Sequence, residues 1–157
     1  MKFIGPPCQS SNFVVIETPW RHNGVPIRVT INQALVARFR LACRRAVKLE
    51  WKPRRIDSFN CRQIRGSTSW SRHAFASAWD FFRTGPSVPP PGGVWQPNDT
   101  FGEKFALVFE DLGFTWGGRW ARGDFPHIEW SGNAVPALTL KERRSTYKKF
   151  KARGTAR

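Results

Sequence analysis

The chain has 157 residues, of which 40% are hydrophobic, and it contains 8 Trp and 13 Phe. This is about one domain with ample material for a core, which excludes an intrinsically disordered chain. The formal net charge of +15 implies an anionic partner, such as nucleic acid, a membrane surface or the bacterial wall, and charge alone does not choose among them.

No apolar run approaches the roughly 18 residues that a membrane-spanning helix needs. Met1 to Cys8 contain one Lys and no apolar core of about seven residues, so no secretory signal is expected. We therefore expect synthesis in the cytoplasm without a signal peptide. The three cysteines, Cys8, Cys43 and Cys61, lack C-x-x-C spacing, and we interpret them as reduced thiols.

The first 53 residues predict two strands and one helix. Residues 1–12 are expected to be loose, and Phe13–Glu17 and Val25–Ile31 are typical strands. Residues 18–24 between them are rich in turn formers, so His22 is expected to be an exposed loop histidine. A helix is expected to open at Asn32 and to end before Pro53, with an apolar stripe of Leu35, Phe39, Ala42, Ala46 and Leu49. The basic residues off this stripe are expected to form a solvated face: Arg38, Arg44, Arg45 and Lys48.

The rest of the chain predicts further short strands and a second helix. Strands are expected at 54–61, 77–82 and around 127–130, and a Pro- and Gly-rich exposed loop at 84–98, with Trp95 as an apolar anchor. Thr100-x-x-Glu103 has the form of a capping box for a helix that ends at Gly113. Its apolar stripe is Phe101, Phe105, Val108 and Leu112.

The predicted organisation is a loose segment at 1–12, one domain at 13–140 and a basic tail at 141–157. The tail carries a net charge of +7, and the remaining +8 lies in residues 1–140, so both parts are basic. Its composition favours a mobile tail that is helical in part.

Two of the three histidines lie in segments that also contain carboxylates. In the first segment the pattern S-x-H-x-x-G-x-A-x-D fits Ser71, His73, Ala78 and Asp80. In the second, His127 lies between Asp124 and Glu129.

Two imidazoles and one carboxylate, from His73, His127 and Asp80, form a set of three metal ligands. Such a set leaves a fourth position open for water, as in catalytic zinc sites, whereas structural zinc is usually closed by four side chains. Asp124 precedes His127 by three residues and is the candidate base for that water. The same ligand types also form the facial triad of non-haem iron enzymes, but that chemistry does not need a base beside the last histidine and hydrolysis does, so zinc is favoured.

The sequence resembles the zinc peptidases that include VanY-type D-Ala-D-Ala carboxypeptidases and the L-Ala-D-Glu endopeptidases of bacteriophage endolysins. The resemblance covers roughly Thr18 to Trp130, and its motifs come in the family's order. They are Phe59-Asn60-Cys61-Arg62, the segment 71–80, Gly113-Phe114-Thr115-Trp116-Gly117-Gly118-Arg119-Trp120, and Asp124-x-x-His127-x-Glu129.

The resemblance implies a single α+β domain like the hedgehog/DD-peptidase fold, with a small antiparallel sheet and helices packed on one side. It implies one Zn²⁺ held by His73, Asp80 and His127, with Asp124 as the general base. Arg62 would stabilise the oxyanion, with Arg65 as its rival, since a guanidinium stays charged and offers several donors in a plane.

Further roles follow from the same resemblance, each beside a plainer alternative. Ser71 would bind substrate or hold the ligand loop, or would form only a local turn. Glu129 would orient a ligand histidine, or would be a structural carboxylate. Trp116 and Trp120 would wall the cleft, or would pack in the core.

Ala76 occupies the place where the family pattern has Gly. Glycine in such a place usually serves a positive φ or a close backbone approach, so Ala there puts the loop between His73 and Asp80 in question. This departure motivates an alternative, a catalytically inactive peptidase-fold protein that binds cell wall or serves a virion structure. A nucleic-acid-binding module is a further alternative from the charge and aromatics, but no recognition motif appears.

The sequence therefore predicts a zinc metallopeptidase that hydrolyses a peptide bond in the peptidoglycan stem. The expected type is an L-Ala-D-Glu endopeptidase or a D-Ala-D-Ala carboxypeptidase. Asp124 resembles the endopeptidase branch, which carries Asp at this place where the carboxypeptidase branch more often carries Glu, and this favours the endopeptidase. We expect a phage lysin, free or virion-borne, that acts at the bacterial cell wall, where its basic surface binds anionic polymers. The bond that is cut, a host origin and the oligomeric state stay open.

Overall fold

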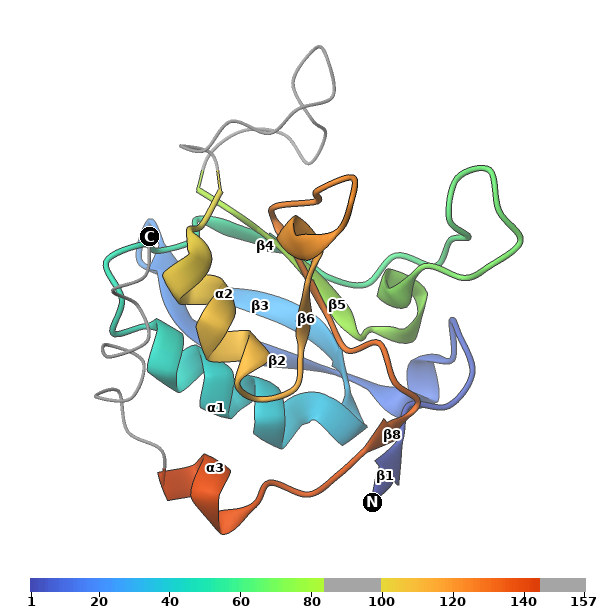
Figure 1. The fold of residues 1–157 in the computed structure, drawn as a ribbon, viewed down its shortest axis with the longest axis horizontal. Helices are drawn as coiled ribbons and strands as arrows, with labels where there is room; N and C mark the ends of the chain where they lie inside the picture. Colours follow the sequence, from blue (N-terminus) through green and yellow to red (C-terminus); the bar gives the residue numbers. More distant parts are fainter. Residues whose placement is uncertain (84–99, 145–157) are drawn as a thin grey trace.

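A four-stranded antiparallel sheet lies at the centre of the computed structural model, which describes residues 1–83 and 100–144 (Figure 1). Its strand order is β4 (Arg55–Asp57), β5 (Ala78–Phe82), β7 (His127–Glu129) and β6 (Thr115–Trp116). A separate hairpin consists of β2 (Phe13–His22) and β3 (Val25–Asn32), and β1 (Lys2–Phe3) pairs with β8 (Ala134–Val135).

Three α-helices lie in the described part of the chain: α1 (Val36–Ala46), α2 (Glu103–Glu110) and α3 (Leu140–Arg144). Short 3-10 turns precede or connect these elements, namely η1 (Ser10–Asn12), η2 (Gln33–Leu35), η3 (Arg72–Phe75) and η4 (Gly117–Arg119). Figure 1 shows α1 and α2 side by side over the sheets. The mixed α+β architecture with small antiparallel sheets is confirmed.

The core lies between the helices and one face of the central sheet. Phe39 of α1 packs on Trp79 of β5, with ring centroids 4.3 Å apart. Phe105 and Phe109 of α2 both pack on Phe81, at 5.3 and 5.4 Å. Burying aromatic side chains of this size stabilises the fold by about 2–3 kcal/mol each, so this layer fixes α1 and α2 against the sheet.

The strand register sorts the side chains of the central sheet onto two faces. Trp79 pairs with Ile128, which pairs with Trp116, and all three are buried on the core face. Successive residues alternate between faces. The opposite face therefore carries Asp80 paired with His127, and the next row holds Ala78, Glu129 and Thr115.

The first hairpin is longer than expected. β2 continues through residues 18–22, which the sequence assigned to a turn, and the reversal occurs only at Asn23 and Gly24. Ile16, Thr18 and Trp20 are buried at alternate positions, which is the period of a strand with one covered face. A register shift between Glu17 and Arg21 lets the strand pass Pro19, and His22 is exposed as expected.

The first helix follows the prediction in its apolar stripe as far as Ala46, where it ends before Leu49, but not in its charged face. Asn32 caps η2 by accepting from the Ala34 N–H at 3.1 Å, and the stripe from Leu35 to Ala46 is buried. Arg38 and Arg45 were expected in solvent, yet only 3% and 5% of their surfaces are exposed. That expectation was wrong for these two residues.

The burial of Arg38 is explained by the C-terminal segment that crosses α1. The Arg38 guanidinium donates to the carbonyls of Leu112 (2.8 Å) and Pro136 (2.9 Å) and to the carboxylate of Glu142 (2.7 Å). Arg45 donates to the backbone carbonyl of Glu142. The segment assigned to a tail thus begins with a docked helix, α3, and residues 145–157 lie outside the described part.

The second helix shows the predicted stripe with a different start. Its N-cap is Gly102, and no side chain caps it, so the capping box at Thr100 was wrong. Gly113 has φ +87 and donates its N–H to the Glu110 carbonyl at 2.9 Å, which confirms it as the C-terminal cap. The stripe is buried as expected: Phe101, Phe105, Val108 and Leu112.

The N-terminal segment is held in place rather than loose. Besides the β1–β8 pairing, Ile4 is fully buried, and Cys8 forms a disulfide with Cys61. The interpretation of reduced thiols was therefore wrong for these two cysteines, while Cys43 is free and buried. The two cysteines are 53 residues apart in the sequence, so no local sequence pattern predicts that they form a disulfide.

The remaining expectations concern strands, the loop and the membrane. Of the strand expected at 54–61 only β4 forms, whereas β5 and β7 lie where they were expected. The predicted loop at 84–98, with Trp95, lies outside the described residues. Among residues 1–83 and 100–144, none of the helices is long and apolar enough to cross a bilayer.

Candidate metal centre

His73, Asp80 and His127 come together on the open face of the central sheet. Asp80 lies in the middle of β5, His127 begins β7 directly opposite, and His73 lies on η3 just before β5. Each offers one ligand atom, and these atoms all lie within 4.8 Å of one another. The structure therefore brings together the three residues that the sequence proposed as metal ligands.

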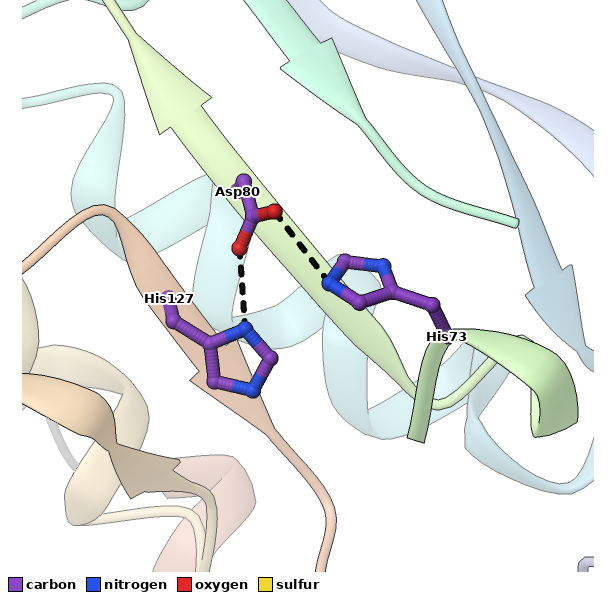
Figure 2. Close-up of side chains that lie close together, drawn as sticks. All are labelled: His73, Asp80 and His127. Atoms are coloured by element: carbon purple, nitrogen blue, oxygen red, sulfur yellow. Dashed lines mark hydrogen bonds and ion pairs between the residues drawn. The ribbon is translucent and has the colours of Figure 1, made fainter. Parts of the chain in front are cut away.

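Both imidazoles point toward the same carboxylate (Figure 2). His73 Nε2 lies 3.2 Å from Asp80 Oδ2, and His127 Nδ1 lies 2.9 Å from Asp80 Oδ1. Two ligands of a tetrahedral zinc ion, each at about 2.0–2.1 Å, lie about 3.3 Å apart. The spacing thus fits a small tetrahedral ion held by one nitrogen of each histidine and the carboxylate.

The far nitrogen of each imidazole is held by an acceptor. His73 Nδ1 contacts the backbone carbonyl of Ser58, which can only accept, so Nδ1 carries a proton. His127 Nε2 lies 2.9 Å from Glu129 Oε2, which orients that ring in the same way. Ligand histidines characteristically donate their other ring N–H to such partners, so Nε2 of His73 and Nδ1 of His127 are the atoms that could bind a metal here.

Ser58 is itself fixed by the neighbouring hairpin. Its hydroxyl accepts from the Thr30 backbone N–H of β3 at 3.0 Å. Sequence reasoning missed Ser58 because it acts through its carbonyl, which any residue type would supply.

The charged groups of this site strongly shift one another's pKa values. Burial alone would raise the pKa of Asp80, but hydrogen bonds from His127 and His73 outweigh it and hold the pKa well below its ordinary value. Burial would lower the pKa of His127, but the acceptors Asp80 and Glu129 raise it to about 10. Without a metal, therefore, His127 is an imidazolium held between two carboxylates at neutral pH.

Asp124 lies beside this group on the loop before β7. Burial raises its pKa and so does the charge of Asp80, and both outweigh the charges of His127, His73 and Arg62, which lower it. A raised pKa suits a carboxylate that must take up a proton during a reaction.

Gly117 allows the close approach of the Asp124 loop. A Cβ at Gly117 would lie 2.5 Å from the Asp124 carbonyl oxygen and 3.1 Å from the His127 Cβ. The Gly117 carbonyl accepts from the Asp124 N–H at 2.9 Å, and the Asp124 carbonyl accepts from the His127 N–H at 3.2 Å. The glycine of the Trp-Gly-Gly motif thus positions the candidate base.

A cleft of about 380 Å³ opens over the ligand group. His73 and Asp80 line it together with residues 57–60 and Arg62, so the ligands have an open side. Arg62 is exposed, and its NH1 lies 3.4 Å from the Gln63 carbonyl. Arg65 is exposed farther along the same loop and is not among the described residues that line the cleft.

The two tryptophans fall on opposite sides of the sheet. Trp116 is 8% exposed, belongs to the core and donates its indole N–H to the Phe125 carbonyl at 2.9 Å. The cleft-wall role was therefore wrong for Trp116, because the alternation within β6 turns it to the core face. Trp120 is 41% exposed, and its ring lies 5.2 Å from that of His127, beside the ligand group.

Ser71 and Ala76 shape the turn that carries His73. Ser71 is buried as the N-cap of η3 and accepts from the His73 N–H at 3.3 Å, which is a local turn within the segment that carries this ligand. Ala76 has φ 50 and ψ 39, a left-handed conformation that favours glycine and costs other residues about 1–2 kcal/mol. Its N–H donates to His73 and its carbonyl accepts from Asn32, so Ala keeps the turn that the family pattern assigns to Gly.

The comparisons with curated proteins and with solved structures gave no match. A family model described as D-alanyl-D-alanine carboxypeptidase matches residues 65–130, a segment that contains the three ligands, Asp124 and Glu129 but not Arg62. The part of the chain that builds the metal centre is therefore similar to the D-alanyl-D-alanine carboxypeptidase family, and this likeness supports a peptidase.

Proposed function

We propose that this protein is a zinc-dependent peptidase that hydrolyses a peptide bond in the peptidoglycan stem. The bond is of the L-Ala-D-Glu endopeptidase or the D-Ala-D-Ala carboxypeptidase type. In this proposal the protein is a phage lysin that acts at the bacterial cell wall. The similarity of residues 65–130 to D-alanyl-D-alanine carboxypeptidases supports the substrate class.

One observation carries the proposal: two imidazoles are oriented so that their free nitrogens face one carboxylate at an open cleft. The Ser58 carbonyl and the Glu129 carboxylate hold the far nitrogens, which leaves His73 Nε2, His127 Nδ1 and Asp80 for the metal. Three ligands with one open side are the form of catalytic zinc, and a His₂Asp set of mixed nitrogen and oxygen donors suits that ion. Bound there, zinc would polarise a water molecule and the scissile carbonyl.

Asp124 is the residue that moves protons in this scheme. Its carboxylate takes a proton from the attacking water as the water oxygen bonds to the carbonyl carbon. It then gives that proton to the leaving amine as the C–N bond breaks, so one water is consumed per peptide bond. Its partly buried position and raised pKa support this role.

Arg62 and Trp120 act on the substrate. The Arg62 guanidinium lines the cleft and stabilises the negative charge that develops on the carbonyl oxygen. The exposed Trp120 ring beside His127 covers the substrate from the other side. The net charge of +15 favours binding to the anionic polymers of the wall, and residues 141–157 supply +7 of it.

The test is incubation of the zinc-loaded protein with purified peptidoglycan, followed by mass spectrometry of the released fragments. The fragments are expected to carry new amino and carboxyl ends at one type of bond, which identifies the substrate bond directly. The Asp124→Ala variant should lose at least about 100-fold in rate, since it lacks the group that transfers the proton.

Glu50→Ala is the matched control, because Glu50 is an exposed carboxylate in the turn that follows α1. It should keep the wild-type rate. If the wild-type protein binds zinc but releases no fragments, the peptidase proposal is wrong and the inactive scaffold replaces it.

A further inference from the structure

We infer that Ser131 is a positioning residue for the metal centre, which it reaches through Glu129 and His127. The inference rests on the proposed function, because it concerns the same ligands. Ser131 lies just after β7, outside the segment that matches the carboxypeptidase family, and it touches no ligand directly.

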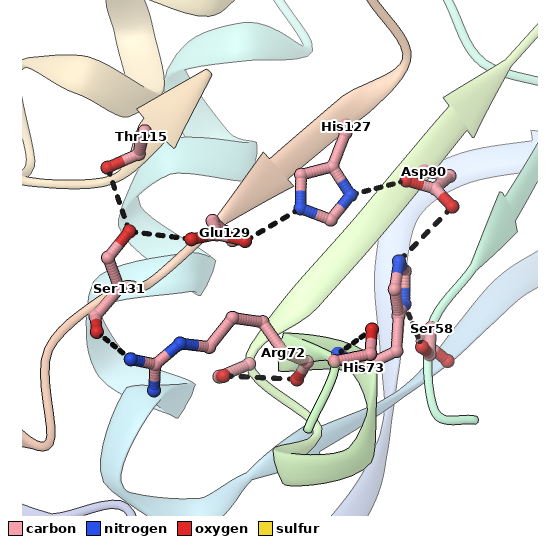
Figure 3. A network of polar contacts seen from close by, with 10 residues as sticks. Ser58, Arg72, His73, Asp80, Thr115, His127, Glu129 and Ser131 are labelled. Atoms are coloured by element: carbon pink, nitrogen blue, oxygen red, sulfur yellow. Dashed lines mark hydrogen bonds and ion pairs between the residues drawn. The ribbon is translucent and has the colours of Figure 1, made fainter. Parts of the chain in front are cut away.

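A line of hydrogen bonds leads from β6 to the ligand group (Figure 3). The Thr115 and Ser131 hydroxyls lie 3.2 Å apart, and the Ser131 hydroxyl lies 2.7 Å from Glu129 Oε1. The other carboxylate oxygen, Glu129 Oε2, lies 2.9 Å from His127 Nε2. Each oxygen of Glu129 thus has one donor, and the carboxylate is held at both ends.

The chemistry of these groups gives the line one direction. Ser131 has a single hydroxyl proton, and the ionised carboxylate can only accept, so Ser131 donates to Glu129. Thr115 then donates to Ser131, and His127 donates its Nε2 proton to Glu129 from the other side. The result fixes the Nε2 proton of His127 and leaves Nδ1 as the metal-facing atom.

Ser131 also joins the two segments that carry the histidines. Its backbone carbonyl accepts from the guanidinium of Arg72, which lies next to His73 on η3. That guanidinium packs over the Phe75 ring at 5.3 Å, so its position is itself restrained. Ser131 therefore holds Glu129 with its side chain and the His73 turn with its backbone.

Removing the hydroxyl should loosen Glu129 and the His127 ring without removing a ligand. Partners that orient ligand histidines typically change metal affinity 10–100-fold when they are lost. Ser131 contacts Glu129 rather than a ligand histidine, so we expect its loss to weaken zinc affinity by about tenfold, the lower end of that range.

The experiment measures zinc Kd by competition with a chromophoric chelator for Ser131→Ala, Ser131→Thr and Thr115→Val. Ser131→Ala should raise the zinc Kd about tenfold over the wild type. Ser131→Thr should keep the Kd within about twofold of the wild type, because threonine also carries a hydroxyl at this position. Thr115→Val should raise it only about 2–3-fold, since it removes the outermost donor. Ser10→Ala, at an exposed serine of η1, is the control and should leave the Kd unchanged.

Hydrolysis at saturating zinc gives a second readout. For Ser131→Ala, kcat should fall while KM stays within about twofold, because the ligand geometry changes and the substrate contacts do not. A merely structural role would instead lower the melting temperature of the metal-free protein and leave Kd and kcat unchanged once folded.

The inference is overturned if folded Ser131→Ala binds zinc as tightly as the wild type, or if Ser131→Thr fails to restore the affinity. If Ser131→Ala does not fold, the zinc Kd of Thr115→Val tests the inference instead. A Kd equal to that of the wild type would then overturn it. If the wild type binds zinc but cleaves no peptidoglycan, the proposed function fails while the Kd series still decides on Ser131. If the wild type binds no zinc, both fail.

Discussion

At the scale of single residues, Asp80 organises the site because both imidazoles face its carboxylate, His73 Nε2 at 3.2 Å and His127 Nδ1 at 2.9 Å. It is partly buried on the sheet face, where an ionised carboxylate without partners would be costly. The two imidazoles are its partners in the metal-free protein, and a metal ion held between the three side chains would compensate the same charge. The same three side chains therefore suit both states.

The raised pKa of His127 makes metal binding depend on pH. Burial lowers the pKa of His127, but Asp80 and Glu129 raise it more, to about 10. His127 is therefore protonated at neutral pH, and its Nδ1 proton must leave before that nitrogen can bind a metal. Zinc Kd should therefore rise about tenfold for each unit by which pH falls between 8 and 6. Calorimetry at pH 7 in two buffers of different ionisation enthalpy should detect about one proton released per zinc. A Kd that is constant across this range would contradict the assignment.

At the scale of elements, the C-terminal helix α3 is attached through one acidic residue in a basic stretch. Glu142 pairs with the buried Arg38 at 2.7 Å, and its carboxylate also accepts from the Thr139 N–H at 2.7 Å. Burial tends to raise the pKa of Glu142, but Thr139 and Arg38 outweigh it and lower the pKa. The pair therefore anchors α3 to α1.

Glu142→Gln should destabilise the protein by about 2–3 kcal/mol, because the buried Arg38 guanidinium loses its counter-charge. The lowered pKa means that the contribution of Glu142 is present above the ordinary pKa of a glutamate. It is lost as pH falls through the lower pKa of the folded state. Urea unfolding at pH 7 and pH 3 measures both effects, and the variant and wild type should differ less at pH 3. Glu50→Gln, at an exposed position, should match the wild type at both pH values.

At the scale of the whole molecule, the Cys8–Cys61 disulfide joins the N-terminal segment to the strip that lines the cleft. Cys61 precedes Arg62, and the Cys8 N–H donates to the Ala74 carbonyl at 2.6 Å, on the turn that carries His73. The bond thus ties the N-terminal segment to the chain next to Arg62, while the Cys8 N–H ties it to the turn that carries His73. It does so across 53 residues of chain, which is the separation at which a cross-link restricts the unfolded state strongly.

Replacing both cysteines, Cys8→Ala with Cys61→Ala, should lower the free energy of unfolding by about 4 kcal/mol in the chain-entropy model. Guanidinium unfolding with and without a reducing agent measures this loss. The reducing agent should lower the midpoint of the wild type and leave that of the double variant unchanged. Equal midpoints for the oxidised wild type and the double variant would show that the bond adds no stability.

Local patterns in the sequence determined the elements and the ligand types. The apolar stripes of α1 and α2 recur at helical spacing. The resemblance of the segments around His73, Asp80 and His127 to a zinc peptidase family indicated these three as candidate ligands. The positive φ at residue 76 was likewise indicated by the place that Ala76 occupies in a pattern with Gly.

Contacts between distant segments were decided only by the tertiary structure. The burial of Arg38 depends on Glu142, 104 residues away, and the disulfide and the Ser58 carbonyl that holds His73 likewise come from other parts of the chain. Trp116 shows the same limit: it faces the core because of the strand register of β6 with β7, and a shift of one residue would turn it to the other face. Trp120 lies beyond β6, and only its contact with the His127 ring places it beside the ligands. The periodicity of apolar residues predicts which residues share a face of a helix or strand, but only the tertiary packing determines which distant segment covers that face.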